Sequence, residues 1–124
     1  MVPALHLRDV ATLALDPIGP RVGATRGAPV ESGVVLFEDA HLEAGVWECT
    51  PGCFPSRREG YREAVTVLAG RGVLRDADGT EHPVEPGVAL ALPEGWSGEW
   101  DITETVRKFY VVTYSEPREK SSTP

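Results

Sequence analysis

Two short apolar stretches carry side chains that could move protons. One covers residues 61–68 and contains Glu63, and the other covers residues 108–114 and contains Lys108 and Tyr110. Both stretches are rich in β-branched and aromatic residues, which is typical of strands. A carboxylate, an amine and a phenol brought together in an apolar site have perturbed proton affinities and can act as general acid and base.

The segments that would position these side chains are short and separated by turns. The chain has 11 prolines and 13 glycines, and no window of roughly 11 residues has the periodicity of an amphipathic helix. In D76-A-D-G-T80, the pair Asp78-Gly79 predicts a hairpin turn with positive φ. This pattern predicts an all-β, antiparallel sandwich or barrel. The expected strands lie near residues 34–37, 46–49, 64–68, 72–75, 82–85, 88–92, 99–102 and 108–114.

Composition limits the classes of partner. The chain has 124 residues, the size of one domain, and 19 acidic against 12 basic residues give a net charge of -7. We expect neither nucleic acid nor membrane as a partner, because both favour basic surfaces. No stretch of about 18 apolar residues and no signal sequence is visible, so we expect a cytoplasmic protein. All but two of the basic residues are arginine, a bias associated with GC-rich bacterial genomes.

Three regions follow from this pattern. Residues 1–28 are rich in proline and glycine and are expected to form an N-terminal arm that crosses the body and adds an edge strand. Residues 29–114 form the barrel, and residues 115–124 are polar and are expected to be a disordered tail. Cys49 and Cys53 have a spacing unlike that of redox or zinc motifs, so we expect two reduced thiols beside a turn.

Several phrases of the sequence resemble the cupin superfamily over residues 30–114. Glu63, six residues and Gly70 match the end of the first cupin motif, and Gly87, five residues and Pro93-Glu94-Gly95 match the start of the second. The similarity is to small single-domain cupins related to ureidoglycine aminohydrolase and the ethanolamine-utilisation cupin. It implies an antiparallel jelly-roll β-barrel that is open at one end and commonly forms a homodimer. Further matching phrases are G45-V-W-E-C-T-P-G-C-F54, D78-G79 and V106-R-K-F-Y-V-V112.

The sequence departs from the metal-binding cupins at their ligand positions. Metal-dependent cupins present three histidines and a glutamate, of which only Glu63 is present. The first two histidine positions fall at Arg57 and Glu59, or at Ser56 and Arg58 if the spacing to Glu63 is one residue longer. The third histidine position falls at Gly98. Arginines near the carboxylate would oppose a cation. We therefore expect no metal and no cofactor. The chain's histidines lie elsewhere, at His6, His41 and His82.

The resemblance also suggests which residues face the interior. If Glu63 points into the barrel as its cupin counterpart does, strand alternation places Val65 and Val67 inside with it. We expect Lys108 and Tyr110 inside near Glu63, because a buried carboxylate needs a partner. In the alternative, Phe109 packs inside and Lys108 lies on the surface.

Other polar and aromatic residues are expected to surround a ligand at the barrel mouth. Aromatic rings offer a planar ligand an apolar wall with a polar edge, although some of these rings could instead cover the core or a dimer interface. The candidates for substrate binding are Arg57, Glu59, Tyr61, Trp47, Trp96 and Trp100.

These expectations lead to three hypotheses about function. The first is a metal-independent enzyme of small-molecule metabolism, of isomerase, cyclase, dehydratase or hydrolase type, with Glu63 as acid and base and Lys108 and Tyr110 beside it. The second is a non-catalytic cupin that binds a metabolite or stabilises a partner enzyme. The third is a metal-dependent enzyme using Glu59, Glu63 and a ligand such as His6. In each case the expected partner is a small organic molecule.

Overall fold

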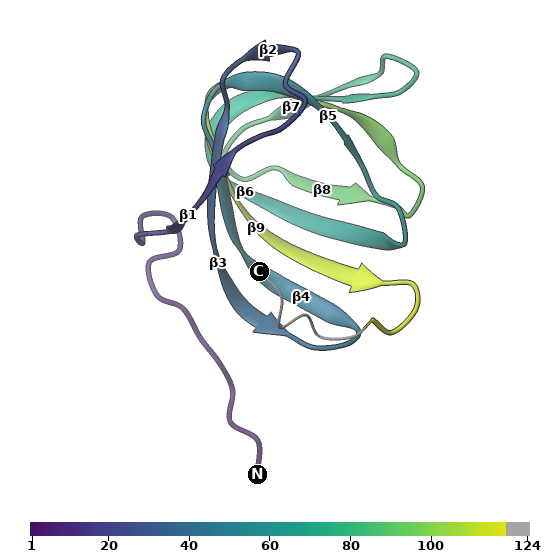
Figure 1. Ribbon diagram of the computed structural model, residues 1–124. Coiled ribbons are helices and arrows are strands. Elements are labelled where there is room, and N and C mark those ends of the chain that lie inside the picture. Colours follow the sequence, from purple (N-terminus) through teal and green to yellow (C-terminus); the bar gives the residue numbers. More distant parts are fainter. Residues whose placement is uncertain (119–124) are drawn as a thin grey trace.

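The computed structural model describes residues 1–118, and all of its regular elements are antiparallel strands (Figure 1). The expectation of an all-β fold is confirmed. The strands are β1 (Asp16–Pro20), β2 (Arg26–Gly27), β3 (Val30–Glu38), β4 (Leu42–Cys49), β5 (Gly52–Arg57), β6 (Tyr61–Asp76), β7 (Glu81–Val84), β8 (Ala89–Leu92) and β9 (Ser97–Tyr114).

Two long strands, β6 and β9, pair with each other and connect the shorter strands on either side of the barrel. The first half of β6 pairs with β8 and with the end of β9, whereas its second half pairs with β7 and with the start of β9. The end of β9 also pairs with β4, and its start pairs with β5. The strands therefore curve around a common interior, giving the cup-like shape seen in Figure 1.

The bend in β6 depends on Gly70. The register between β6 and β9 shifts on both sides of Ala69, and Gly70 has a φ of +96°. A Cβ atom at this position would lie 2.6 Å from the Cα of Val106 and would collide with the backbone oxygen of Thr105. Glycine is therefore required here both by the left-handed backbone and by the close approach of β9. The expected breaks between residues 68 and 72 and between residues 102 and 108 are bends within continuous strands.

The hairpin expected at residues 76–80 is confirmed. The Asp76 amide donates to the Thr80 carbonyl oxygen at 2.8 Å, and Gly79 has a φ of +92°. The following strand β7 pairs with residues 72–75 of β6. The turn therefore has the positive φ that its Asp-Gly pair predicts.

The core lies between the two halves of the barrel. Trp100 and Phe54 are its largest members, each 1% exposed. Cys49 and Cys53 are both buried and are free thiols, so the structure contains no bond between them. The remaining members of the core cluster are Val65, Val67, Leu74, Val84, Leu92, Ile102 and Val106.

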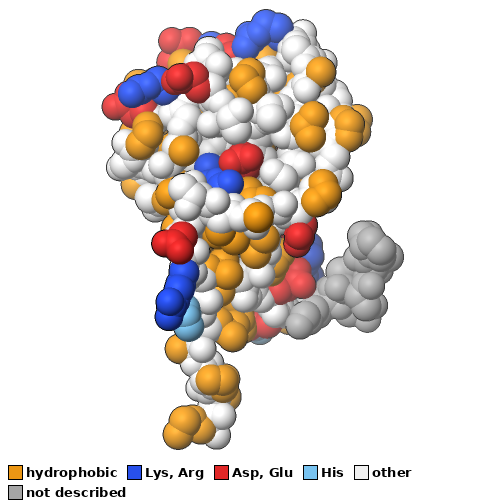
Figure 2. Space-filling model, turned by 90° about the vertical axis from the view of Figure 1, so that its left-hand side faces the viewer, with side chains coloured by type: hydrophobic (Ala, Val, Ile, Leu, Met, Phe, Trp, Pro, Cys, Tyr) orange, Lys and Arg blue, Asp and Glu red, His pale blue; other side chains and the backbone are white. Residues whose placement is uncertain are grey.

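Residues 1–28 contain two strands that add to the barrel. Strand β1 pairs with residues 30–33 of β3, and the short β2 pairs with β5. Between residues 1 and 15 the chain leaves the body, as Figures 1 and 2 show, and hydrophobic side chains are exposed on the projecting segment. The side chain of Arg107 holds the base of this segment by donating to the carbonyl oxygens of Val10 and Leu13.

The start of the expected tail contacts the barrel. The Ser115 amide donates to the Gly60 carbonyl oxygen at 3.0 Å, and the Arg118 amide donates to the Ala40 carbonyl oxygen at 2.8 Å. Residues 119–124, the rest of the expected tail, lie outside the described residues. Within residues 1–118, no helix is long and apolar enough to cross a membrane.

Candidate functional site

The barrel contains a cavity of about 740 Å³ that opens to solvent. Strands β4, β5, β6 and β9 supply most of its wall, and β1 and β3 supply part of the rim. The cavity combines apolar and aromatic surface with a few charged groups, as ligand sites commonly do. Its polar and aromatic lining residues include Arg21, Glu31, Glu43, Trp47, Ser56, Arg57, Arg58, Tyr61, Glu63, Trp100, Lys108 and Tyr110.

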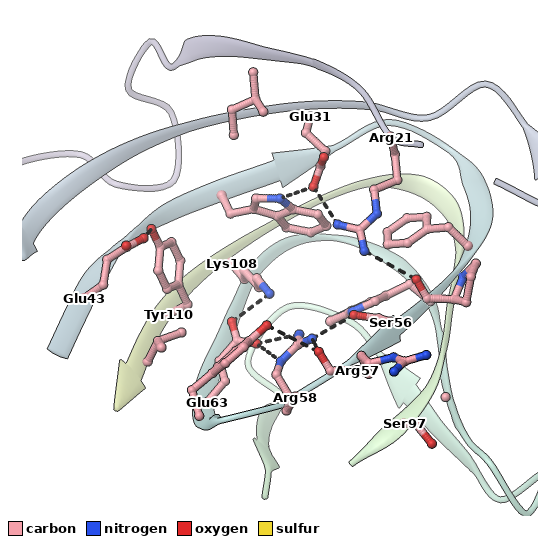
Figure 3. Close-up of a pocket in the computed structure, with 18 of the residues that line it drawn as sticks. Arg21, Glu31, Glu43, Ser56, Arg57, Arg58, Glu63, Ser97, Lys108 and Tyr110 are labelled. Atoms are coloured by element: carbon pink, nitrogen blue, oxygen red, sulfur yellow. Dashed lines mark hydrogen bonds and ion pairs between the residues drawn. The ribbon is translucent and has the colours of Figure 1, made fainter. Parts of the chain in front are cut away.

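One carboxylate and two cations meet in the cavity wall, and we call them the Arg58–Glu63–Lys108 triad (Figure 3). Lys108 Nζ lies 2.8 Å from Glu63 Oε2, and Arg58 Nε lies 2.8 Å from Glu63 Oε1. Each of the three residues is at most 6% exposed. Both oxygens of Glu63 therefore already bind a cation. The alternative in which Lys108 lies on the surface is excluded by its burial.

Strand geometry brings the triad together. Glu63 lies on the inward face of β6 with Val65 and Val67, and Lys108 lies opposite Val67 on β9. Arg58 follows β5 directly, and its amide donates to the Trp96 carbonyl oxygen at 2.8 Å. The turn before β9 thus fixes the backbone from which the Arg58 side chain reaches Glu63.

The charges of the triad shift each other's proton affinities. Burial raises the pKa of Glu63, but the positive charges and hydrogen bonds of Lys108 and Arg58 lower it by more, so its pKa lies below the ordinary value of 4.5. Burial also lowers the pKa of Lys108, and Arg58 adds to this effect while Glu63 opposes it. Glu63 is therefore a weak base, whereas Lys108 gives up its proton more readily than an exposed lysine.

Two tryptophans flank the ammonium group of Lys108. Its Nζ lies 4.5 Å from the centroid of the Trp47 ring and 5.1 Å from that of Trp100. The two ring centroids are 6.0 Å apart, and the rings are tilted by 43°. Trp100 also belongs to the core, so one ring serves both packing and the cavity wall. Cation–π contacts of this kind stabilise the charged form of the lysine.

Tyr110 lies in the same cavity but has a different partner from the one expected. Its hydroxyl donates to Glu43 Oε2 at 2.7 Å, not to Glu63. Burial raises the pKa of Tyr110, and Glu43 raises it further. The phenol therefore keeps its proton and is unsuited to act as a base. In Figure 3, the Glu43 and Tyr110 pair lies at a different part of the cavity from Arg58.

The other expected binding residues divide between the cavity and its outer edge. Trp47 and Tyr61 line the cavity, and Arg57 lines its rim with a side chain that is 75% exposed. Glu59 and Trp96 do not line it, because Glu59 points into solvent and the Trp96 indole donates to Asp76 Oδ1 at 2.8 Å. Both border a second, more polar depression beside the mouth.

Four charged residues that line the cavity were not among the site residues expected from the sequence, namely Arg21, Glu31, Glu43 and Arg58. Arg58 was considered as a metal-ligand position without a ligand and, with Arg57 and Arg62, as part of a mixed-charge surface or a pocket wall. Arg21 lies in the expected arm, and Glu31 follows it. Arg21 Nη1 lies 3.2 Å from Glu31 Oε1, and the same oxygen accepts the Trp47 indole N–H at 2.9 Å. Arg21 and Glu31 carry no local signal, because only the pairing of β1, β3 and β4 brings them to the cavity.

The residues at the cupin ligand positions do not fit a metal ion. The cavity is lined by Ser56, Arg58, Glu63 and Gly98, and Ser56 lies opposite Gly98 in the sheet. The alignment that places the first two histidine positions at Ser56 and Arg58 therefore agrees with the fold. A hydroxyl, a guanidinium and a glycine offer no imidazole, and both oxygens of Glu63 are occupied by cations. Arg58 takes the space of one ligand and opposes a second cation.

The ligands of the metal-dependent hypothesis are not brought together. Within residues 1–118, no three His, Cys, Asp or Glu side chains lie close enough to hold a metal ion. The side chain of Glu59 is 81% exposed, and Glu59 lies in the turn between β5 and β6, outside both strands. His6 lies on the exposed N-terminal segment, and His82 pairs with Asp76 at 2.8 Å.

Several solved structures resemble this fold. A protein of unknown function from Pseudomonas syringae pv. tomato is 32% identical, with a TM-score of 0.73 over 83% of this chain, and this chain spans 46% of that protein's length. The EutQ protein of Clostridium difficile is 21% identical, with a TM-score of 0.61 and 70% of each chain covered. The polyketide cyclase RemF from Streptomyces resistomycificus is 19% identical, with a TM-score of 0.65, and the match covers 100% of this chain and 87% of that one.

The last two likenesses, at 21% and 19% identity, concern the fold alone. No curated protein matches the sequence significantly. The family description "EutQ-like cupin domain" matches residues 36–110, which is more than half of the chain and includes Glu63 and Lys108. The expected similarity to the ethanolamine-utilisation cupin is thereby confirmed, and the chain belongs to the EutQ-like cupin family.

Proposed function

We propose that the cavity binds a small organic molecule and that the protein is a non-redox enzyme of isomerase, cyclase, dehydratase or hydrolase type. The observation that carries this proposal is the buried ammonium of Lys108 beside Glu63 in a cavity walled by tryptophans. Groups with shifted proton affinities in a cleft are candidates for acid and base catalysis. The reaction needs no cofactor in this proposal.

In this proposal Lys108, not Glu63, moves the proton. Among residues 1–118, Glu63 is the one hydrogen-bond acceptor of Lys108, which leaves N–H bonds that can meet a substrate oxygen. When a neighbouring C–H bond loses its proton to water, Lys108 gives its own proton to the developing oxyanion and then regains one from solvent. Glu63 and Arg58 stay charged throughout and hold the amine in place.

The test uses phenylpyruvate, whose benzylic C–H bonds lie next to a ketone. We expect the full chain to accelerate deuterium incorporation at this carbon in heavy water, measured by proton NMR. Lys108→Met keeps a similar length without the charge and is expected to reduce the acceleration by about 100-fold, within the range of general acid catalysis. Arg71→Gln is the matched control, because Arg71 is exposed and pairs with Glu85 away from the cavity.

The second candidate is a non-catalytic binding module. It is favoured by the complete pairing of Glu63 and of the Tyr110 hydroxyl, since such pairs also occur as purely structural groups. Phenylpyruvate that binds with no gain in deuterium incorporation would contradict catalysis and support this module. Equal acceleration by wild type and Lys108→Met would contradict the role of Lys108 as the proton donor.

A further inference from the structure

Charge is unevenly distributed inside the cavity. In the Arg58–Glu63–Lys108 triad two cations share a single carboxylate, which leaves one positive charge unbalanced. Arg21 and Glu31 form a neutral pair at 3.2 Å. The cavity therefore has a cationic end that is hardly exposed to solvent, where charge is weakly screened.

The opposite sign prevails at another part of the wall. Glu43 accepts hydrogen bonds from Tyr110 at 2.7 Å and from Tyr114 at 3.4 Å, and no cation pairs with it among residues 1–118. An anionic ligand is repelled from this carboxylate and attracted to the triad. The arrangement thus orients a charged ligand as well as attracting it.

Unused donors lie at the cationic end. Arg58 Nη1 already donates to Ser56 Oγ at 2.7 Å and to the Arg57 carbonyl oxygen at 3.1 Å. Lys108 has three N–H bonds, and within the described residues only Glu63 accepts one of them. The nitrogen lies against the faces of Trp47 and Trp100, so a ligand oxygen that reaches it brings its carbon skeleton beside these rings.

From these three features we propose that the ligand of the cavity is a planar organic anion. Its carboxylate or enolate oxygen accepts a hydrogen bond from Lys108 Nζ, and its conjugated part lies along Trp47, away from Glu43. This inference deepens the proposed function, because it names the ligand class of the same cavity. It does not depend on catalysis.

The test compares two probes of the same shape, trans-cinnamate and trans-cinnamamide, by isothermal titration calorimetry at low salt with the full chain. We expect cinnamate to bind at least about tenfold more tightly, because a charge-assisted hydrogen bond is replaced by a neutral one in the amide. In Lys108→Met, cinnamate is expected to lose this advantage, whereas cinnamamide changes little. Arg71→Gln is expected to leave both affinities unchanged.

Two outcomes overturn the inference and separate it from the proposed function. If cinnamamide binds as tightly as cinnamate, the cavity binds organic molecules and only the ligand class is wrong. If neither probe binds at concentrations up to about 10 mM, both proposals fall. Selective binding of cinnamate without exchange of phenylpyruvate supports the ligand class and contradicts catalysis. The comparison of the two probes uses the wild-type protein, so it is decisive even if Lys108→Met does not fold.

Discussion

Glu63 is a buried carboxylate with a cation on each oxygen, and replacing it tests how much this carboxylate contributes to the stability of the fold. In Glu63→Gln, the charges of Arg58 and Lys108 are left together in the interior without a counter-charge. We expect the free energy of unfolding to fall by about 3–5 kcal/mol, the usual cost of breaking a buried ion pair from one side. Urea denaturation followed by circular dichroism measures this change.

The control for this substitution is Glu104→Gln. Glu104 also pairs with an arginine, at 3.4 Å, but its side chain is 65% exposed. An exposed pair contributes little, so we expect a change within about 0.5 kcal/mol. Equal effects of the two substitutions would contradict the structural importance of the triad.

The lowered pKa of Glu63 predicts a particular acid dependence. In the unfolded chain Glu63 takes up a proton near its ordinary pKa of 4.5, whereas in the folded protein it stays ionised to lower pH. Its contribution to stability is therefore present above pH 4.5 and is lost as the pH falls through the folded pKa. Unfolding free energies of wild type and Glu63→Gln, measured from neutral pH downwards, should converge in acid. A constant difference would contradict this.

At the residue level, sequence reasoning located Glu63 and Lys108 but misjudged their neighbours. Strand alternation and the need of a buried carboxylate for a partner are local arguments. They placed Glu63 and Lys108 correctly because β6 and β9 are neighbouring strands. The partner of Tyr110 is Glu43, on β4, which no local pattern indicates. Arg58 occupies a position where the family pattern has a histidine, so it was read as a missing ligand although it is a cation in its own right.

Among the strands, the bend of β6 at Gly70 gives a prediction with a close internal control. Gly70 and Gly87 have similar φ angles, +96° and +92°, but a Cβ atom at Gly87 meets nothing within 4 Å. Gly87→Ala should therefore cost about 1–2 kcal/mol from backbone strain alone. Gly70→Ala adds a collision with β9 and should cost at least about 2 kcal/mol more.

Thermal or urea denaturation of both variants measures this difference. If the two substitutions had the same effect, the close approach of β9 to Gly70 would be wrong. A fully unfolded Gly70→Ala chain beside a folded Gly87→Ala chain would agree with the prediction.

Strand β5 was not predicted from the sequence. Its segment contains Gly52 and Pro55 and follows Pro51, so it resembles a turn. The structure tolerates Pro55 because β5 pairs with β9 on one side, whereas β2 covers only Gly52 and Cys53 on the other. Proline is compatible with such a partly open edge. The hairpin at residues 76–80, by contrast, is specified by its own side chains and was predicted.

For the whole molecule, the homodimer expected from the family resemblance stays a prediction. Residues 34–38 of β3 pair with β4, but within residues 1–118 no strand pairs with them on the β1 side. Val35 and Phe37 on this segment are 51% and 41% exposed. An unpaired antiparallel edge with apolar side chains suits a two-fold contact with a second copy of the chain.

Light scattering coupled to size-exclusion chromatography checks this expectation. We expect twice the monomer mass for wild type and the monomer mass for Phe37→Glu, because a charge would be buried at the contact. Val22→Glu is the control, since Val22 is 91% exposed in a turn. A monomeric wild type, or a dimeric Phe37→Glu, would contradict this arrangement.

The barrel fold could be predicted from the whole sequence. The positions of the strands that residues 1–28 add to the barrel could not be predicted. The motif around Glu63 and Gly70 and the turn before Trp96 carry enough spacing information to identify the fold. Residues 1–28 have no such pattern, and only the tertiary pairing of β1 with β3 brings Arg21 to the cavity. Long-range pairing of this kind depends on the assembled barrel.

The position of Trp47 and Trp100 beside Lys108 has a practical consequence. The chain has 3 tryptophans, and these two line the cavity with an ammonium group against their faces. A ligand that engages this ammonium changes the electric field at both indole rings. The intrinsic fluorescence of the unlabelled protein therefore provides an optical signal for occupancy, and its emission wavelength offers a direct way to screen compounds.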